Sequence, residues 1–193
     1  MFYRMCRFIG RILAEILFVP DVRGTGNVPE EGAFLLCSNH IHALDPIAVS
    51  VLIDREPRFM GKKELFESWF GKWLFGKLRA FPVDRSVSAD MKSFRTAMNV
   101  LKNGHGLVIF SQGTRMKEFE GSKSGVALFA LKSGAPIVPV GIVGTYRLFS
   151  KVSVRYGEPI YPDEFAGKRV STEAVERVME VVVERVSALC EPN

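Results

Sequence analysis

A histidine and a carboxylate stand five residues apart between two apolar segments of the chain. His40 follows the apolar stretch 33–37, and Asp45 precedes the apolar stretch 47–53. A neutral imidazole accepts a proton near pH 7, and a carboxylate bonded to its other ring nitrogen fixes the tautomer and stabilises the imidazolium that forms. His40 and Asp45 are therefore candidates for a catalytic base and the group that orients it, provided that His40 lies in the loop before the helix.

Two other roles are open for these residues. Asp45 followed by Pro46 is typical of a helix N-cap and its first helical residue, a role that needs no catalysis. His42 would add a third ligand to a metal site with His40 and Asp45, but three ligands within six residues are sparse, and His105 is the only other histidine. We therefore expect no metal.

Polar segments follow three of the apolar stretches that we predict to be strands. Residues 39–40, 84–85 and 111–115 each follow such a stretch. Active sites of parallel sheets lie beyond the carboxyl ends of the strands. We therefore expect the three segments to converge on one cleft.

The third of these segments suits an anion. Gly113 lets the backbone approach a ligand, Thr114 adds a hydroxyl, and Arg115 offers a planar fork of donors for phosphate oxygens. Arg85 is a second anion-binding candidate, unless it forms an ion pair with Asp84 or another acid.

The segment 62–79 mixes lysines with aromatic residues. Without further context, the adjacent Lys62 and Lys63 are interpreted as a pair of solvent-exposed charges. The aromatic run that follows is either a core helix or a surface for lipid, since tryptophan favours the headgroup zone of a membrane. Its members are Phe66, Trp69, Phe70, Trp73 and Phe75.

Short apolar stretches alternate with amphipathic ones along the chain, which indicates a single α/β domain with a mostly parallel central sheet flanked by helices. The length of 193 residues and the hydrophobic content of 47% fit one well-packed domain. Strands are expected at 33–37, 58–60, 81–83, 107–110, 137–140 and 152–154. Helices are expected at 46–53, at 65–78 with a break near Gly71 or Gly76, from Met91 to a stop at Gly104, at 124–133, and after the cap Ser171 with Val175, Val178, Met179, Val182, Val183, Val186 and Leu189 on one face.

The first twenty residues predict an amphipathic helix lying in a membrane interface. Its two faces are Arg4, Arg7 and Arg11 against Met5, Ile9, Ile12, Leu13 and Ile16. No small-residue cleavage site follows at 19–23, so we expect the segment to be retained rather than removed as a signal peptide. Packing on the domain core is the alternative. We divide the chain into this interfacial helix, 1–20, and one globular domain, 21–193.

Charge and cysteine usage narrow the class of partner. The net charge of +5 and the pI near 9.2 favour anionic partners such as phosphate groups, anionic membranes or nucleic acid. Nucleic-acid binding has the charge but no recognisable module. Cys6, Cys37 and Cys190 are odd in number and lack metal-like spacing, so we expect thiols in a reducing, cytoplasmic compartment.

Four sequence blocks in order resemble the glycerolipid acyltransferase family, and most of all the small bacterial lysophosphatidate (1-acyl-sn-glycerol-3-phosphate) acyltransferases. The blocks are 39–46, 81–85, 110–115 and 135–141, and the resemblance extends over roughly residues 28–160. It implies that His40 is the catalytic base and Asp45 its partner. It also implies an acceptor-phosphate site, comprising Arg115, Thr114, Gly113, Gln112, Arg85 and Lys62.

Two positions depart from the family pattern. Gln112 stands where the family usually has glutamate, which keeps the shape and one acceptor oxygen but loses the charge. If the family's glutamate acts by hydrogen bonding, we expect this chain to stay active with glutamine. If the charge of the glutamate tunes the arginine or the acceptor hydroxyl, we expect this chain to use a different acceptor substrate. Arg79 stands where glycine is common.

The resemblance implies direct acyl transfer from a thioester, acyl-CoA or acyl-carrier protein, to the free hydroxyl of lysophosphatidate, giving phosphatidate for phospholipid synthesis. It implies no cofactor, a lysophospholipid acceptor and a membrane surface as partners, and a peripheral or monotopic place on the cytoplasmic face of the cell membrane. Other acceptors, such as glycerol 3-phosphate or another lyso-lipid, and a non-catalytic anion-binding or membrane-binding role are the alternatives. An acyl-enzyme on Cys37 is not expected, because a thiol within an apolar strand is usually inert.

Overall fold

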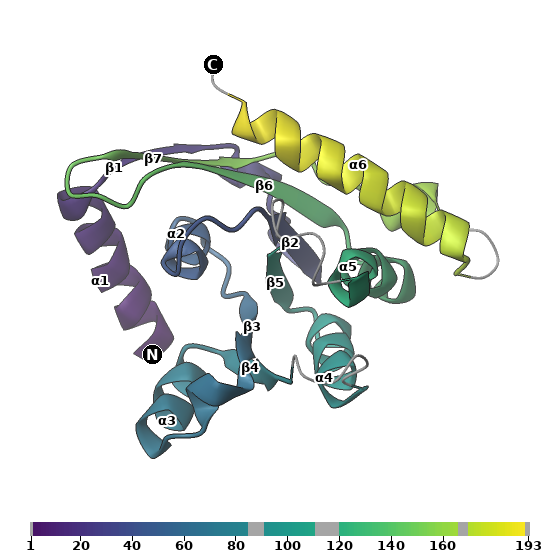
Figure 1. Cartoon of the computed structure of the whole chain (residues 1–193), viewed down its shortest axis with the longest axis horizontal. Helices are drawn as coiled ribbons and strands as arrows, with labels where there is room; N and C mark the ends of the chain where they lie inside the picture. The colour runs from purple at the N-terminus through teal and green to yellow at the C-terminus, as the bar shows by residue number, and fades with distance from the viewer. Residues whose placement is uncertain (1, 85–90, 111–119, 166–169, 192–193) are drawn as a thin grey trace.

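The computed structural model describes residues 2–84, 91–110, 120–165 and 170–191, without the side chains of residues 120–124. Seven strands form one sheet in the order β1-β7-β6-β2-β5-β3-β4 (Figure 1). The strands are β1 (Val19–Arg23), β2 (Phe34–Ser38), β3 (Arg58–Lys62), β4 (Ala80–Val83), β5 (Gly106–Phe110), β6 (Ile137–Gly144) and β7 (Lys151–Tyr156). Neighbouring strands run parallel except β6 and β7, which are antiparallel. The predicted α/β class with a mostly parallel sheet is confirmed.

Helices cover both faces of this sheet. Within the described ranges the α-helices are α1 (Phe2–Leu17), α2 (Asp45–Val51), α3 (Trp69–Lys77), α4 (Met91–Lys102), α5 (Glu120–Ser133) and α6 (Thr172–Cys190), and the 3-10 turns are η1 (Thr25–Asn27), η2 (Lys63–Phe66) and η3 (Pro162–Glu164). Figure 1 shows α1 and α2 on one face, α4, α5 and α6 on the other, and α3 near β4. None of the helices described is both long enough and apolar enough to cross a bilayer.

Strand β2 is buried in the middle of the sheet and contributes to two cores. Leu35 and Cys37 belong to the core shared with α4, α5 and α6, whereas Phe34 and Leu36 belong to the core on the α2 side. Successive side chains of a strand point to opposite faces, so a strand covered on both faces reads as a continuous apolar run. The continuous apolar run therefore predicted both β2 and the loop that begins at Asn39.

Strand β1 was missing from the prediction. It lies at the edge of the sheet and pairs only with β7 among the described strands. Pro20 within it has no N–H to donate, which only an edge strand or a strand end tolerates, so the segment lacks the usual appearance of a strand. The N–H of Val19 donates to the carbonyl of Ser150 at 3.0 Å, and this contact helps to join the end of α1 to the sheet.

The predicted helix at 65–78 is broken, but not at a glycine. η2 ends at Phe66, and α3 begins after Ser68, whose hydroxyl accepts the N–H of Gly71 at 2.9 Å. The N-cap therefore sets the break. Gly71 lies inside α3, and glycine is needed there because a Cβ would come within 2.1 Å of the carbonyl oxygen of Leu65.

The last helix begins as predicted, since the hydroxyl of Ser171 accepts the N–H of Ala174 at 3.1 Å. Its buried stripe is narrower than the predicted face and consists of Ala174, Val178, Val182 and Val186. The prediction was wrong for Val183, which is 46% exposed. The stripe follows a spacing of four residues, and position 183 is rotated by about 100° from position 182.

Candidate active site

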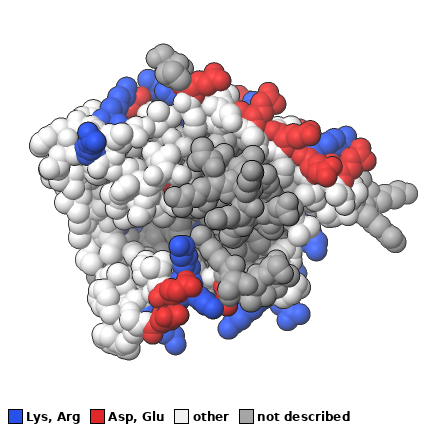
Figure 2. Space-filling view, in the orientation of Figure 1, with Lys and Arg blue, Asp and Glu red and all other residues white. Residues whose placement is uncertain are grey.

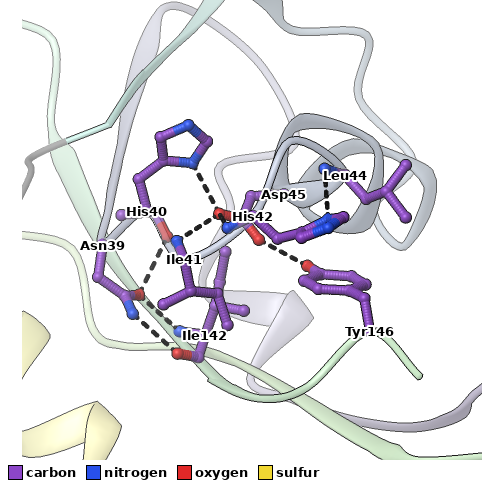
Figure 3. A network of polar contacts seen from close by, with 9 residues as sticks. Asn39, His40, Ile41, His42, Leu44, Asp45, Ile142 and Tyr146 are labelled. Carbon is purple, nitrogen blue, oxygen red and sulfur yellow. Dashed lines mark hydrogen bonds and ion pairs between the residues drawn. The ribbon is translucent and has the colours of Figure 1, made fainter.

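The loop between β2 and α2 brings His40 and Asp45 into contact. His40 Nδ1 lies 2.7 Å from Asp45 Oδ2 (Figure 3). Because a carboxylate is an acceptor, Nδ1 carries the proton in this pair and donates it, and neutral His40 keeps a lone pair on Nε2. In Figure 3 the second ring nitrogen of His40 points away from Asp45. The side chain of His40 is 31% exposed.

Asp45 is fully buried and binds the loop that precedes it. Its Oδ2 also accepts the backbone N–H groups of Ile41 at 2.7 Å and of His42 at 2.8 Å. Leu44, not Asp45, is the N-cap residue of α2, and Asp45 is the first residue of the helix. The interpretation of Asp45 as a plain N-cap was therefore wrong, because its carboxylate folds back onto the loop instead of capping the helix.

Asn39 anchors the same loop to the neighbouring strand. Its amide nitrogen donates to the carbonyl of Ile142 in β6 at 2.8 Å, and its amide oxygen accepts the N–H of Ile142 at 2.7 Å (Figure 3). This two-way pairing fixes the orientation of the amide and continues the contact between β2 and β6 beyond the end of β2. It also fixes the backbone immediately before His40.

Tyr146, which the sequence did not single out, completes the surroundings of Asp45. Its hydroxyl donates to Asp45 Oδ1 at 2.7 Å from the loop that follows β6. Burial, followed by the hydrogen bond to Asp45, raises the pKa of the Tyr146 hydroxyl, so it stays a donor at neutral pH. No local pattern could reveal this contact, because it depends on β6 lying beside β2.

The carboxyl ends of β2, β5, β3 and β4 lie at one edge of the sheet, because these strands run parallel. Ser38 is paired with Phe110, and Lys62 with Val83. The ring of His40 lies 4.7 Å from the ring of Phe110, between centroids. The three polar segments predicted to converge are therefore attached to strands that end at the same edge as His40.

Most of the predicted phosphate-binding residues cannot be placed. Arg85, Gln112, Gly113, Thr114 and Arg115 lie outside the described residues. Lys62 is described and exposed at the end of β3. The next residue, Lys63, donates to Asp84 Oδ2 at 2.8 Å, and this hydrogen bond raises the pKa of the Lys63 ammonium. Asp84 thus pairs with Lys63, and the alternative of an ion pair between Asp84 and Arg85 stays a prediction, because Arg85 lies outside the described residues.

Two exposed apolar surfaces lie on α1 and α3. On α3, Trp69 is 81% and Phe70 58% exposed. Phe75 of α3 and Phe66 of η2 are half-buried against each other. The exposed apolar side chains of α1 are Met5, Phe8, Ile9, Ile12, Leu13 and Ile16. The rings of Phe2 and Trp73 meet at 5.5 Å and connect the two helices. Figure 2 shows few charged side chains over the left part of the molecule, where Figure 1 places α1.

Within the described part of the chain, no group of three or more His, Cys, Asp or Glu side chains could hold a metal ion. The arrangement of His40 and Asp45 instead suits proton transfer to or from a substrate at Nε2.

Comparisons with known proteins agree with this chemistry. The family model described as Acyltransferase matches residues 19–143. A 1-acyl-sn-glycerol-3-phosphate acyltransferase of Bacillus subtilis is 30% identical over 97% of this chain and 96% of its own length. One of Streptococcus pneumoniae is 27% identical over 92% of this chain and 69% of its own.

A solved structure has the same fold. The crystal structure of the 1-acyl-sn-glycerophosphate (LPA) acyltransferase PlsC from Thermotoga maritima superposes with a TM-score of 0.71 at 24% identity. The match covers 97% of this chain and 79% of that one.

Proposed function

As the chain belongs to the acyltransferase family, we propose that it moves a fatty acyl group from a thioester donor to the free hydroxyl of lysophosphatidate, giving phosphatidate. The observation that carries this proposal is the contact of His40 Nδ1 with the buried carboxylate of Asp45, which leaves Nε2 free to act as a base. The names of the relatives from Bacillus subtilis and Streptococcus pneumoniae support lysophosphatidate as the acceptor.

In the proposed mechanism, the substrate hydroxyl is the nucleophile. His40 Nε2 takes its proton while the hydroxyl oxygen attacks the thioester carbonyl carbon. The tetrahedral intermediate then expels the thiolate, which receives the proton from the imidazolium. Asp45 stabilises the imidazolium between these steps, as the acid of a catalytic triad does. General-base catalysis of this kind contributes about 10²–10⁴ in rate.

No acyl-enzyme is needed in this scheme. Cys37 is fully buried and packs in the core shared with α4, α5 and α6. A thiol held among apolar side chains resists ionisation and cannot reach a substrate beside His40.

For the acceptor phosphate we assign Arg115, Thr114, Gly113, Gln112, Arg85 and Lys62. This assignment is supported by the strands that precede them, which end at the same edge of the sheet as His40. Glutamine at position 112 in place of the family's glutamate favours a second candidate, an acyltransferase whose acceptor is glycerol 3-phosphate or another lyso-lipid.

We also propose that the enzyme is a peripheral or monotopic protein on the cytoplasmic face of the cell membrane. The exposed apolar side chains of α1 and the exposed Trp69 and Phe70 of α3 support this placement. Tryptophan and bulky apolar residues are the side chains that enter the headgroup region of a bilayer.

The proposal is tested with the purified full chain in detergent. Acyl-CoA and acyl-carrier protein are offered in turn as donors, and lysophosphatidate, glycerol 3-phosphate and a lyso-lipid without a phosphomonoester as acceptors. Phosphatidate formed at the highest kcat/KM from lysophosphatidate is the expected result. Preference for another acceptor would support the second candidate, and no thioester consumption with any pair would contradict an acyltransferase activity.

A further inference from the structure

The buried carboxylate of Asp45 is held very differently at its two oxygens. Three donors converge on Oδ2, namely His40 Nδ1 and the N–H groups of Ile41 and His42. In the described structure, Oδ1 accepts only the hydroxyl of Tyr146, at 2.7 Å. The torsion that turns a carboxylate about its Cβ–Cγ bond is soft and roughly two-fold. The Tyr146 hydroxyl is therefore the contact that fixes the plane of the carboxylate from its second side.

The ring of Tyr146 is itself fixed by two aromatic neighbours. It stacks on the ring of His42, with centroids 4.7 Å apart and planes 27° from parallel. Phe18, directly after α1, meets it edge to face at 5.6 Å. Tyr146 is thus held between the catalytic loop and the end of α1, so its hydroxyl has little freedom to leave Asp45. Figure 3 shows this hydroxyl directed at the Asp45 carboxylate.

The backbone of the loop that carries Tyr146 is restricted as well. Gly144, two residues before it, has a φ of 129°, and a Cβ there would lie 2.3 Å from the carbonyl oxygen of Lys151. The N–H of Phe149 donates to the carbonyl of Leu17 at 2.7 Å. The loop from β6 to β7 is consequently bound at both ends, to the sheet and to α1.

We infer that Tyr146 is a positioning residue for the proton-transfer pair, which acts by holding the Asp45 carboxylate in the plane that His40 Nδ1 requires. This inference rests on the proposed role of His40 as base and adds a member to that site. The positioning role gives a reason for the contact between the Tyr146 hydroxyl and the Asp45 carboxylate, which are 101 positions apart in the sequence.

The direct test is Tyr146→Phe, which keeps the ring between His42 and Phe18 and removes only the hydroxyl. We expect kcat to fall about 10–100-fold, as is usual when a group that orients a functional residue is lost. The KM for the thioester donor and the KM for the acceptor should change little. The matched control is Tyr156→Phe. The Tyr156 hydroxyl also donates over 2.7 Å, but from a buried side chain and to the carbonyl of Val49. This control is expected to keep the wild-type kcat.

A second readout separates positioning from general loss of structure. In wild-type protein, the proton on His40 Nδ1 should give a downfield ¹H NMR signal that is absent from His40→Ala. Tyr146→Phe is expected to broaden or shift this signal, and Tyr156→Phe to leave it in place. A signal identical to that of the wild type in Tyr146→Phe would overturn the inference, even with a lower kcat, because the loss would then not pass through Asp45.

The same assays distinguish this inference from the proposed function. Wild-type kcat in Tyr146→Phe, or an equal loss of kcat in Tyr156→Phe, would overturn the positioning role alone, provided that His40→Ala is inactive. Turnover by His40→Ala would overturn the base role and this inference with it.

Discussion

Replacing Asp45 by asparagine removes the charge of the carboxylate while keeping its shape. Because three donors meet at the position of Oδ2, the amide oxygen is expected to take that position, and the amide NH2 then faces the hydroxyl of Tyr146. That hydroxyl can rotate to accept, since it is both donor and acceptor. Asp45→Asn is therefore expected to retain the fold and the orientation of His40.

The variant loses the attraction between the carboxylate and the imidazolium that forms during catalysis. Two unit charges about 4 Å apart attract each other by about 4 kcal/mol at an effective dielectric constant of about 20. The His40 side chain is 31% exposed, so solvent screens part of this attraction. A remaining attraction of about 2–4 kcal/mol corresponds to a fall in kcat of about 30- to 1,000-fold.

The assay is acyl transfer to lysophosphatidate in detergent, with thermal unfolding measured in parallel. Asp45→Ala is the matched control, because it leaves the four donors around Asp45 in the described structure without their acceptor. Each buried group left unpaired costs about 1–3 kcal/mol, so Asp45→Ala is expected to unfold at a clearly lower temperature than Asp45→Asn. A kcat of Asp45→Asn within a few-fold of the wild type would refute the role of the charge, and equal destabilisation of the two variants would refute the predicted geometry.

Three further predictions concern the core, the membrane and pH. Cys37→Ala is expected to keep most of the wild-type kcat, because the thiol lies in a core away from substrate, and complete loss in a folded protein would point to an acyl-enzyme. Trp69→Ser is expected to weaken cosedimentation with anionic vesicles, with Val183→Ser on α6 as the control, and undiminished binding would count against α3 as a docking surface. Burial and the hydrogen bond to Asp45 raise the pKa of Tyr146 above its ordinary value of 10.0, so the stability that this hydroxyl adds is present below that pH and is lost above it. Urea unfolding at about pH 8 and about pH 11 should show a larger loss of stability for wild type than for Tyr146→Phe, and equal losses would contradict this.

The parts of the site within one stretch of chain could be predicted from the sequence. His40 and Asp45 are brought together by a six-residue segment, 40–45, that follows an apolar strand and ends at the first residue of a helix. The continuous apolar run of β2 fixed the start of that segment, because a strand buried on both faces leaves a clear pattern. The direction of the Asp45 carboxylate was not predictable, since an N-cap and a loop anchor have the same local sequence.

The parts that depend on strands meeting across the sheet could not be predicted. Tyr146 reaches Asp45, and Asn39 reaches Ile142, only because β6 lies beside β2. Edge strand β1 was missed for a related reason. Its sequence carries Pro20 and no apolar run, so its strand conformation comes from pairing with β7 and not from local preference.

The measurement that tests the central claim most directly is the initial rate of phosphatidate formation from lysophosphatidate by wild type and by His40→Ala. Both proteins are purified in the same detergent and shown to unfold at similar temperatures. If His40 is the base, His40→Ala loses at least about 10² of the wild-type kcat with a bound thioester donor. Substantial turnover by folded His40→Ala would contradict the assignment of His40 as the group that takes the proton.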